Sequence, residues 1–293
     1  MTTFNRIAIG TVQFGMDYGI ANNLGKVKST EVEQILSLAR HKGIDLLDTA
    51  IAYGSSEKVI GETELEDFRV VTKLPPLPKD SIDIKTWIKN QVKSSLSRLN
   101  QDKLYGLLLH RPKDLIEDNG RQLIETLLDC KNEGIVEKIG VSIYSPDELN
   151  EICNSTQIDI VQAPLNIIDR RMEESGWLKR LKEKNVEIHA RSVFLQGLVL
   201  MEQNKIPKKF SRWSNLWNAW HKSLKHTGIS PLAVCLEYPL SLREIDHVIL
   251  GMDSTKQLFE ILDALENLEG VFDSSFMRSD DLDLINPSNW SRL

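Results

Sequence analysis

Eight short apolar runs, each rich in β-branched residues, recur along this chain of 293 residues, and longer stretches with helical spacing separate them. Nearly continuous apolar runs are typical of strands that are buried on both faces of a parallel sheet. The runs occupy residues 6–10, 44–48, 69–73, 105–110, 138–142, 158–162, 186–192 and 247–252. Eight strands alternating with helices predict an α/β fold, a (β/α)8 TIM barrel in which residues 1–293 form a single domain.

The stretches between these runs carry the signals of helices. Thr30 and Glu33 have the spacing of a capping box in front of an apolar face. Ser145 followed by Pro146 predicts another helix start, because serine caps a helix and proline suits its first position. Apolar side chains also fall along one helical face within residues 85–99, 121–133 and 254–268.

Residues 195–213, which follow the seventh run, make a connection that is too long and too basic for an ordinary barrel loop. We expect this connection to be a lid over a cofactor or substrate. Its lysines are Lys205, Lys208 and Lys209. Contact with cofactor phosphates and simple solvation explain these lysines equally well.

Two groups of residues are candidates for the core. Trp213, Trp217 and Trp220 lie at helical spacing, so we expect them to pack inside, with an aromatic wall of a substrate pocket as the alternative. The cysteines are far apart with no C-x-x-C pair, which predicts neither a disulfide framework nor a metal site. We expect small buried apolar side chains at Cys130, Cys153 and Cys235.

The charge balance excludes several classes of partner. Lys and Arg total 36 and Asp and Glu total 42, which gives a net charge of −6 spread along the chain. A nucleic-acid-binding protein normally carries a basic stripe, and the sequence shows none, so we expect no nucleic-acid partner. No apolar run approaches the roughly 18 residues that span a bilayer, and the first residues are too polar for a signal peptide. We therefore expect a cytoplasmic protein that does not enter the membrane.

Four side chains stand where a barrel enzyme carries its chemistry, at the C-terminal ends of the strands. Asp48, Lys73 and His110 end the second, third and fourth runs, and Tyr53 follows the second. An ammonium group near a phenol favours the phenolate, so we expect Lys73 to lower the pKa of Tyr53 from its usual value of about 10. Asp48 would hold Lys73 charged and in place. His110 would orient a substrate carbonyl that Tyr53 protonates.

Each of these residues also has an ordinary structural role when it is taken singly. Asp48 suits a turn or a helix cap, Lys73 suits a solvated loop, and His110 can simply end a strand. A tyrosine such as Tyr53 most often serves packing. All four types at successive strand ends form the combination that catalysis requires, and this favours the catalytic interpretation.

Extended motifs surround these four residues. They are the stretch DTAIAYG at 48–54, Lys73 after VVT at 70–72, and LLLH at 107–110. These motifs resemble those of the aldo-keto reductase family, and the similarity runs from Ile7 to about Leu265. The resemblance implies a (β/α)8 barrel that reduces an aldehyde or ketone with NAD(P)H, in which nicotinamide C4 gives the hydride and Tyr53 gives the proton.

The same resemblance implies a set of cofactor-binding residues. They are Gly10, Thr11, Asp48, Ser142, Gln162, Arg191, Ser192, Leu195, Gly197, Gly251, Met252, Asp253, Ser254, Gln257 and Glu260. Ser142 and Gln162 resemble the pair that hydrogen-bonds the nicotinamide carboxamide, but Ile143 stands where the family usually has asparagine. Arg191 stands where the family often stacks an aromatic ring on the nicotinamide, and a planar guanidinium can also stack.

The choice between NADPH and NADH depends on residues 251–261 (GMDSTKQLFEI), which resemble the family's adenosine-phosphate motif. Backbone N–H groups at a helix start suit a phosphate. The family commonly has Arg or Lys where Asp253 stands, and an aspartate repels a 2′-phosphate and accepts a hydrogen bond from a free 2′-hydroxyl. The family habit and the nearby Lys256 favour NADPH, and NADH is the competitor.

Other charged residues allow more than one interpretation. Arg170 and Arg171 could hold a substrate carboxylate or phosphate, or could pair with Glu173 or Glu174. His189 lies inside a predicted strand, so we expect a satisfied core histidine.

Two other functions compete with carbonyl reduction. The first is a lyase in which Lys73 forms a Schiff base, because lysines at barrel strand ends serve that chemistry too. The second is a non-catalytic module that binds NAD(P)H and senses its redox state. The sequence predicts a small-molecule carbonyl substrate without fixing its class, since Tyr18 and the tryptophans suit a sugar or an aromatic aldehyde and the arginines suit an acidic compound.

Overall fold

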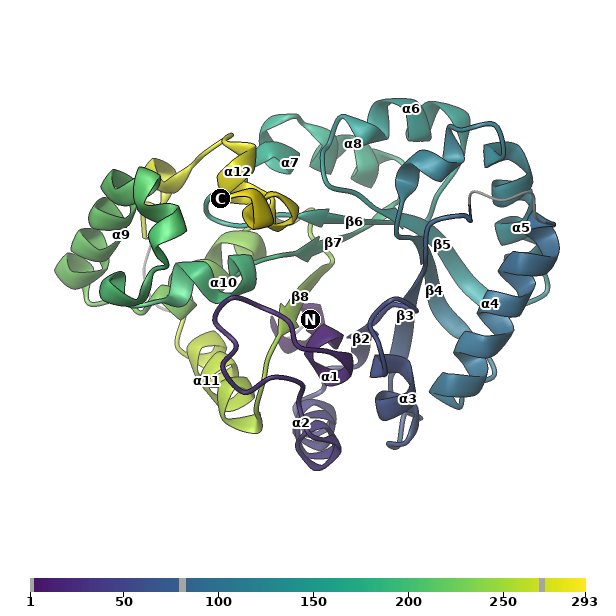
Figure 1. Cartoon of the computed structure of the whole chain (residues 1–293), viewed down its shortest axis with the longest axis horizontal. Helices are drawn as coiled ribbons and strands as arrows, with labels where there is room; N and C mark the ends of the chain where they lie inside the picture. Colours follow the sequence, from purple (N-terminus) through teal and green to yellow (C-terminus); the bar gives the residue numbers. More distant parts are fainter. Residues whose placement is uncertain (1–2, 79–82, 269–271) are drawn as a thin grey trace.

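The computed structural model describes residues 3–78, 83–268 and 272–293, and it contains the predicted barrel. Eight parallel strands pair in sequence order, and β8 pairs with β1 to close the sheet (Figure 1). The strands are β1 (Ile7–Gly10), β2 (Leu46–Asp48), β3 (Arg69–Leu74), β4 (Leu104–Leu109), β5 (Val136–Ser142), β6 (Ile160–Pro164), β7 (Glu187–Arg191) and β8 (His247–Gly251). Each predicted run overlaps one strand, so the predicted α/β fold, a single (β/α)8 barrel, is confirmed.

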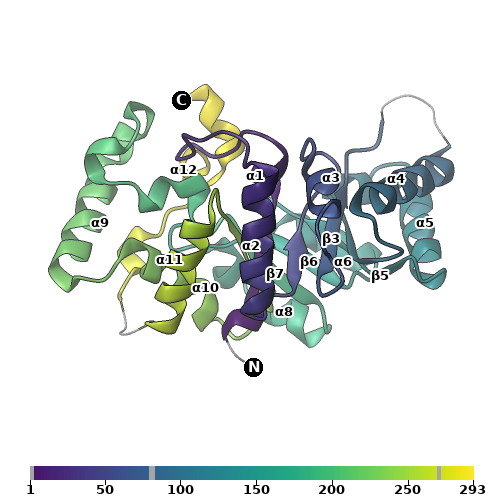
Figure 2. The same ribbon diagram turned by 90° about the horizontal axis from the view of Figure 1, so that it is seen from below.

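Helices surround the barrel, as the two ribbon views show (Figures 1 and 2). They are α1 (Val12–Gly15), α2 (Ser29–His41), α3 (Ser56–Gly61), α4 (Ile84–Leu99), α5 (Gly120–Asn132), α6 (Glu148–Ser155), α7 (Arg171–Glu174), α8 (Trp177–Glu183), α9 (Ser214–Thr227), α10 (Pro231–Ser241), α11 (Thr255–Glu266) and α12 (Leu282–Ile285). Within the described ranges, none of these helices has both the length and the apolar character that a membrane span needs.

Two predicted helix starts are wrong in detail. Helix α2 begins one residue before Thr30, and no side chain accepts a hydrogen bond at its cap, so the capping box does not form. Helix α6 begins at Glu148, three residues after Ser145. The carboxylate of Glu148 accepts the N–H groups of Tyr144 and Ser145, at 2.7 and 2.9 Å, and this turn delays the helix. A side-chain cap does form at another helix, α4, where the carboxylate of Asp83 accepts the N–H of Thr86 at 3.2 Å.

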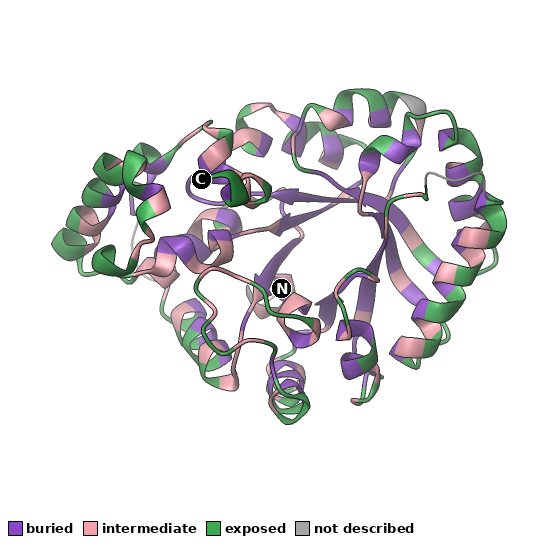
Figure 3. Ribbon diagram, in the orientation of Figure 1, coloured by how far each residue is buried: buried purple, intermediate pink, exposed green. Residues whose placement is uncertain are grey.

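The barrel has a small apolar centre and a larger apolar shell between strands and helices. The centre is made by one inward side chain from each of six strands: Ala8, Leu46, Val71, Leu108, Ile160 and Ile249. The strands are buried along most of their length, whereas the outer faces of the helices are exposed (Figure 3). Side chains of a strand alternate between two faces, so residues two positions further along also point inward.

A second apolar cluster is formed by side chains of α9, α10, α12 and neighbouring turns, and these helices lie beside the barrel (Figure 1). It contains Trp217 and Trp220, which are buried as predicted, while Trp213 is partly buried and precedes the helix α9. Residues 195–213 form three 3-10 turns, and Phe210 in the last of them is fully buried in this cluster. Cys130 and Cys235 are buried as predicted, whereas Cys153 is only half-buried.

Candidate active site

Three of the four predicted catalytic residues, and the predicted cofactor-binding residue Gln162, lie two positions after residues of the apolar centre of the barrel. Asp48, Lys73 and Gln162 follow Leu46, Val71 and Ile160 by two residues, and therefore point inward at the C-terminal end of the barrel. His110 follows Leu108 in the same way. Strand periodicity thus brings the ends of β2, β3, β4 and β6 to one place.

A cavity of about 650 Å³ opens above this layer. It is lined by these predicted site residues: Gly10, Thr11, Asp48, Tyr53, His110, Ser142, Arg191, Ser192, Gly197, Gly251, Asp253, Gln257 and Glu260. Five predicted residues do not line it, namely Lys73, Gln162, Leu195, Met252 and Ser254. Lys73, Gln162 and Leu195 are fully buried and Met252 is nearly so, which places them behind the wall of the cavity.

Asp48 and Lys73 form a buried ion pair under the cavity. Lys73 Nζ donates to both carboxylate oxygens of Asp48 and to the carbonyl of Thr49, at 2.8 Å each. Gln162 extends the network, because its Nε2 donates to Asp48 Oδ1 at 2.7 Å and its Oε1 accepts the hydroxyl of Ser142 at 3.1 Å. The network links the ends of β2, β3, β5 and β6.

Tyr53 lies over Lys73 of this pair, and His110 lies beside Tyr53. The two rings meet edge to face with centroids 5.8 Å apart, and Lys73 Nζ lies 5.0 Å from the centroid of the Tyr53 ring. Burial is the main cause that raises the pKa of Tyr53, and the charge of Asp48 raises it further. The prediction that Lys73 lowers this pKa is therefore wrong, because Asp48 neutralises the ammonium. Burial lowers the pKa of His110 to about 4, and the charge of Lys73 adds to this effect.

The loop that carries Tyr53 is held by close backbone packing. A Cβ on Gly15 of α1 would lie 1.8 Å from the carbonyl oxygen of Tyr53, so only glycine permits this approach. Ser56 Oγ donates to the carbonyl of Thr11 at 2.8 Å. Thr11 Oγ1 in turn donates to the carbonyl of Asp48 at 3.0 Å, which ties the start of α1 to β2.

Arg191 lies at the rim with partners that the sequence did not indicate. Its Nη2 donates to the carbonyl of Ile143 at 2.8 Å, and its Cζ lies 4.7 Å from the centroid of the Tyr144 ring. Tyr144 and Gln13 both line the cavity and were missed. Tyr144 lies in the loop after β5 and Gln13 lies in the short helix α1 after β1, and strand periodicity describes neither position.

The far end of the cavity is acidic and lies at the start of α11. Ser254 Oγ accepts the N–H of Gln257 at 3.2 Å, and Gln257 Oε1 accepts the N–H of Asp253 at 2.7 Å. Glu31 of α2 accepts the N–H of Thr255 at 2.6 Å, and this bond lowers the pKa of Glu31. Three N–H groups that were expected to suit a phosphate are therefore already bonded within the protein.

Two loops cross one side of the cavity and touch each other. Ala21 N donates to the carbonyl of Gln196 at 3.3 Å, and Gln196 Nε2 donates to the hydroxyl of Tyr18 at 3.3 Å. A Cβ on Gly197 would lie 2.4 Å from the Cβ of Ala21. Leu195 and Gln196 have left-handed backbone angles, φ 44° and 53°, which cost free energy for residues other than glycine. Such strain is typical of functional loops.

Arg170, Arg171, Lys205 and Lys209 have partners within the protein. Arg171 forms a bidentate pair with Asp169, with both contacts at 2.8 Å, instead of pairing with Glu173 or Glu174. Arg170 donates to Ser274 Oγ at 2.8 Å, and neither arginine lines the cavity. Among the lysines of residues 195–213, Lys205 lines the cavity and pairs with Glu202 at 2.9 Å, and Lys209 donates to the carbonyl of Trp290.

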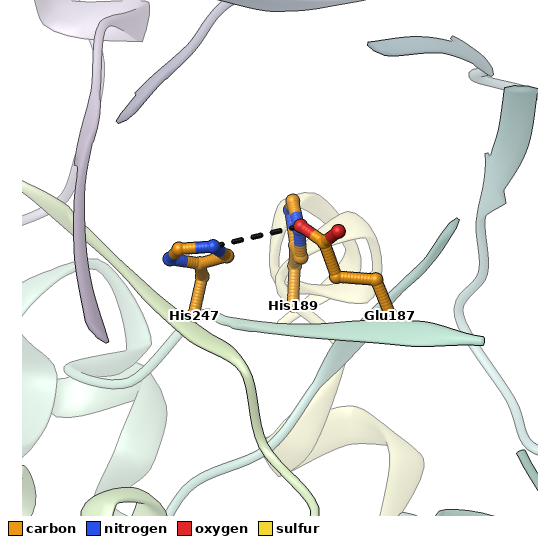
Figure 4. A group of neighbouring side chains, drawn as sticks. All are labelled: Glu187, His189 and His247. Carbon is orange, nitrogen blue, oxygen red and sulfur yellow. Dashed lines mark hydrogen bonds and ion pairs between the residues drawn. The ribbon is translucent and has the colours of Figure 1, made fainter. Parts of the chain in front are cut away.

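A second polar cluster lies at the opposite end of the barrel, where Glu187 begins β7 and His247 begins β8; Figure 4 shows these two residues with His189. Glu187 Oε1 contacts Nε2 of His189 at 2.7 Å and Nε2 of His247 at 3.5 Å. Glu187 Oε2 accepts from Tyr105 and pairs with Lys138. These three residues could hold a metal ion, but Nδ1 of both imidazoles has no partner, whereas a metal-bound imidazole ordinarily donates its other N–H. The geometry favours a structural role for this cluster at the N-terminal end of the barrel, which we call the barrel floor. Of the two ring nitrogens of His189, only Nε2 has a hydrogen-bond partner, so the expected satisfied core histidine is found only in part.

Comparison with known proteins gives a consistent result. A model of the aldo/keto reductase family matches residues 6–279. The oxidoreductase YqkF of Bacillus subtilis (strain 168), described as uncharacterized, is 28% identical over 264 residues, which are 83% of this chain and 84% of that protein. L-galactose dehydrogenase of Arabidopsis thaliana is 25% identical over 281 residues, 90% of this chain and 87% of that one. An NADH-specific methylglyoxal reductase of Escherichia coli (strain K12) is 25% identical over 228 residues, 67% and 66% of the two chains.

Solved structures agree on the fold. The holo form of an aldo-keto reductase from Bacillus halodurans superposes with a TM-score of 0.74 at 22% identity, covering 93% of this chain and 90% of that one. A glycerol dehydrogenase from Gluconobacter oxydans superposes with a TM-score of 0.68 at 21% identity, covering 92% and 88%.

Proposed function

The chain belongs to the aldo/keto reductase family, and from this premise we propose that it reduces a small aldehyde or ketone to an alcohol with a nicotinamide cofactor, and catalyses the reverse oxidation. The observation that carries the proposal is the placement of Tyr53 and His110 side by side on the cavity wall, with Tyr53 over the buried pair of Asp48 and Lys73.

The roles of the residues follow from this geometry. His110, whose pKa of about 4 keeps it neutral at pH 7, hydrogen-bonds the substrate carbonyl. Tyr53 donates the proton, because its raised pKa keeps the phenol protonated until a negative charge develops on the carbonyl oxygen. Lys73 and Asp48 form a fixed support under the phenol of Tyr53. Gln162 connects Asp48 to Ser142 by hydrogen bonds to both residues. A nicotinamide cofactor, when bound, supplies the hydride.

The residues along the cavity fit such a cofactor. The lining runs from Tyr53 at one end to Asp253 and Glu260 at the other, and it includes buried polar atoms without a partner on Gln13, Arg191 and Asp253. We assign the cofactor to the predicted lining residues, with Ser142 at the nicotinamide end. Residues 195–213 are proposed as its cover, with the turn at Gln196 and Gly197 as the part that opens.

The end of the cavity at the start of α11, where we place the adenosine of the cofactor, supports NADH. The cofactor that is usual in the family would be NADPH. Asp253 lines this end and forms no ion pair with any described residue, so it suits a free 2′-hydroxyl. Glu31 occupies the N–H of Thr255 that a 2′-phosphate would use. Two carboxylates at this position repel a phosphate dianion.

The geometry weakens the two competing functions to different degrees. A Schiff-base lyase needs a lysine with a free lone pair in reach of substrate, but Lys73 is fully buried, does not line the cavity and donates three hydrogen bonds. A non-catalytic redox-sensing module has no need of a proton donor, and the chain keeps Tyr53 and His110 on the cavity wall.

A spectrophotometric assay tests the proposal. NADH and NADPH would each be offered with a panel of carbonyl compounds, and loss of absorbance from the reduced cofactor is the expected result. The names of two relatives suggest starting with methylglyoxal, and with L-galactose and the oxidised cofactor for the reverse oxidation. Binding of cofactor without turnover of any carbonyl would instead support the sensing module, and borohydride trapping of substrate on Lys73 would support the lyase.

A further inference from the structure

Arg191 brings a positive charge into the cavity. No carboxylate of the described residues forms an ion pair with it. It is the last residue of β7 and lines the cavity. Neutral groups hold its guanidinium: the carbonyl of Ile143 at 2.8 Å, the hydroxyl of Ser192 at 3.1 Å and the face of Tyr144 at 4.7 Å. These contacts fix the position of the charge without cancelling it.

The other charged groups near Tyr53 among the described residues sum to no net charge, although each acts on its immediate neighbours. Asp48 and Lys73 neutralise each other at 2.8 Å, and His110 is neutral at pH 7 because its pKa lies at about 4. Burial dominates the pKa values of Tyr53 and His110, and the charge of Arg191 also acts on both, lowering each. Within the part of the chain that the structure describes, Arg191 is therefore the one charge without a counter-charge at this end of the cavity, and it acts on both Tyr53 and His110.

Resting on the proposed function, we propose that Arg191 makes the site bind reduced nicotinamide in preference to oxidised nicotinamide, and so favours reduction over oxidation. In the reduction, the C4–H bond of the dihydropyridine ring breaks and its electron pair forms the new C–H bond on the carbonyl carbon. The carbonyl oxygen takes the proton of Tyr53, which solvent later replaces. The ring, neutral before the step, carries one positive charge after it.

The position of the ring follows from the reaction itself. Reacting atoms approach to about 3–3.5 Å, so a ring that passes hydride to a carbonyl bonded to Tyr53 lies in the part of the cavity where Arg191 acts. A fixed cation there raises the free energy of the cationic ring and leaves the neutral ring almost unaffected. For unit charges about 6 Å apart at an effective dielectric constant of about 20, the Coulomb effect exceeds tenfold, and solvent at the mouth reduces it. We expect a preference of about tenfold.

Direct binding measurements test this without relying on turnover. Dissociation constants of the oxidised and reduced forms of one cofactor would be measured by fluorescence titration and calorimetry, with no carbonyl present. The wild-type protein should bind the reduced form about tenfold more tightly. Arg191→Gln should bring the ratio close to one, whereas Arg191→Lys should keep most of it. Arg171→Gln is the matched control, because that arginine is paired with Asp169 outside the cavity.

The outcomes separate this inference from the proposed function. A ratio near one in the wild-type protein overturns the role of Arg191 whatever the variants do, and so does an unchanged ratio in a folded Arg191→Gln. A rise in KM confined to carboxylate-bearing carbonyls, with the ratio unchanged, would make Arg191 a substrate-binding residue instead. If the wild-type protein binds neither form of either cofactor, the proposed function itself fails.

Discussion

Lys73 Nζ donates to both carboxylate oxygens of Asp48, at 2.8 Å each, and the side chain of Lys73 has no exposed surface. Its third proton goes to the carbonyl of Thr49, so the ammonium has no donor left for Tyr53. The pair is therefore a neutral, rigid support beneath the phenol. It positions Tyr53 and does not act on its pKa as a free positive charge would.

Breaking this pair should cost much stability. Asp48→Asn leaves the buried ammonium of Lys73 without its counter-charge, and we expect the free energy of unfolding to fall by about 3–5 kcal/mol. Urea unfolding at pH 7 measures this. Asp45→Asn is the control, because its pair with Arg69 is about as close, at 2.9 Å, but partly exposed, and its loss should cost about 1 kcal/mol or less. Equal losses in the two variants would contradict the role of burial.

Removing the phenol hydroxyl should stop proton donation alone. Tyr53→Phe is expected to lower kcat for carbonyl reduction by about 10² or more, with the cofactor dissociation constant almost unchanged. Steady-state kinetics and a fluorescence titration give both quantities. Tyr105→Phe, at the barrel floor, is the control and should leave kcat unchanged. Near wild-type activity in Tyr53→Phe would remove Tyr53 from the mechanism.

The positions of the catalytic residues could be predicted because a strand has a fixed period of two. Once the apolar runs are located, the residues that end them must point to one rim, and Asp48, Lys73 and His110 do so. The barrel itself follows from the same runs, since eight buried parallel strands close without leaving an edge.

Contacts between distant segments and the pKa values of buried groups could not be predicted from strand periodicity. Glu31 reaches Thr255 across two helices that are far apart in sequence, and no local pattern signals such a contact. The pKa of Tyr53 moved opposite to the expectation, because burial and Asp48 outweigh the neutralised Lys73. The sequence pattern predicts which residues come together, but it does not predict how strongly burial desolvates their side chains.

The acidic end of the cavity should set the cofactor preference. The wild-type protein should bind NADH at least about tenfold more tightly than NADPH, and Asp253→Asn combined with Glu31→Gln should remove most of that difference, because both repulsive charges are lost. Fluorescence titration with the two cofactors measures the ratio. Glu33→Gln, an exposed neighbour on α2, is the control. Tighter binding of NADPH by the wild-type protein would restore the preference expected from the family.

Stability should fall in mild acid. Burial lowers the pKa of His110 and of His247 to about 4, below the value of about 6.5 in an unfolded chain. Between these values the unfolded state binds more protons, so stability present above pH 6.5 is lost as the pH falls towards 4. We expect a loss of roughly 1–2 kcal/mol per imidazole between pH 7 and pH 5.

Urea unfolding at the two pH values measures this loss. His247→Gln should reduce the pH dependence, and His41→Gln, an exposed control, should not. A free energy of unfolding that is the same at pH 7 and pH 5 would mean that neither imidazole is held neutral by the fold.

The last prediction concerns the glycine that holds the catalytic loop. Alanine normally favours a helix over glycine, so Gly15→Ala in α1 would stabilise the chain if space allowed. A Cβ at this position would instead lie 1.8 Å from the carbonyl oxygen of Tyr53 and 2.4 Å from the backbone nitrogen of Ser56, so the loop must move. We expect kcat to fall by about 10-fold to 10²-fold, since a displacement of about 1 Å at a reacting group has that effect.

Gly134→Ala separates this displacement from simple backbone strain. Gly134 has φ +75°, and a Cβ there would meet no atom within 4 Å. This variant should therefore lose about 1 kcal/mol of stability from its left-handed conformation while keeping kcat. The Cβ added at position 15 would push against the loop that carries Tyr53, whereas the Cβ added at position 134 would touch no other atom. The two variants should therefore differ in kcat even where their melting temperatures agree. Equal kcat values in two folded variants would show that Tyr53 is positioned by the side chains around it and not by the approach of Gly15.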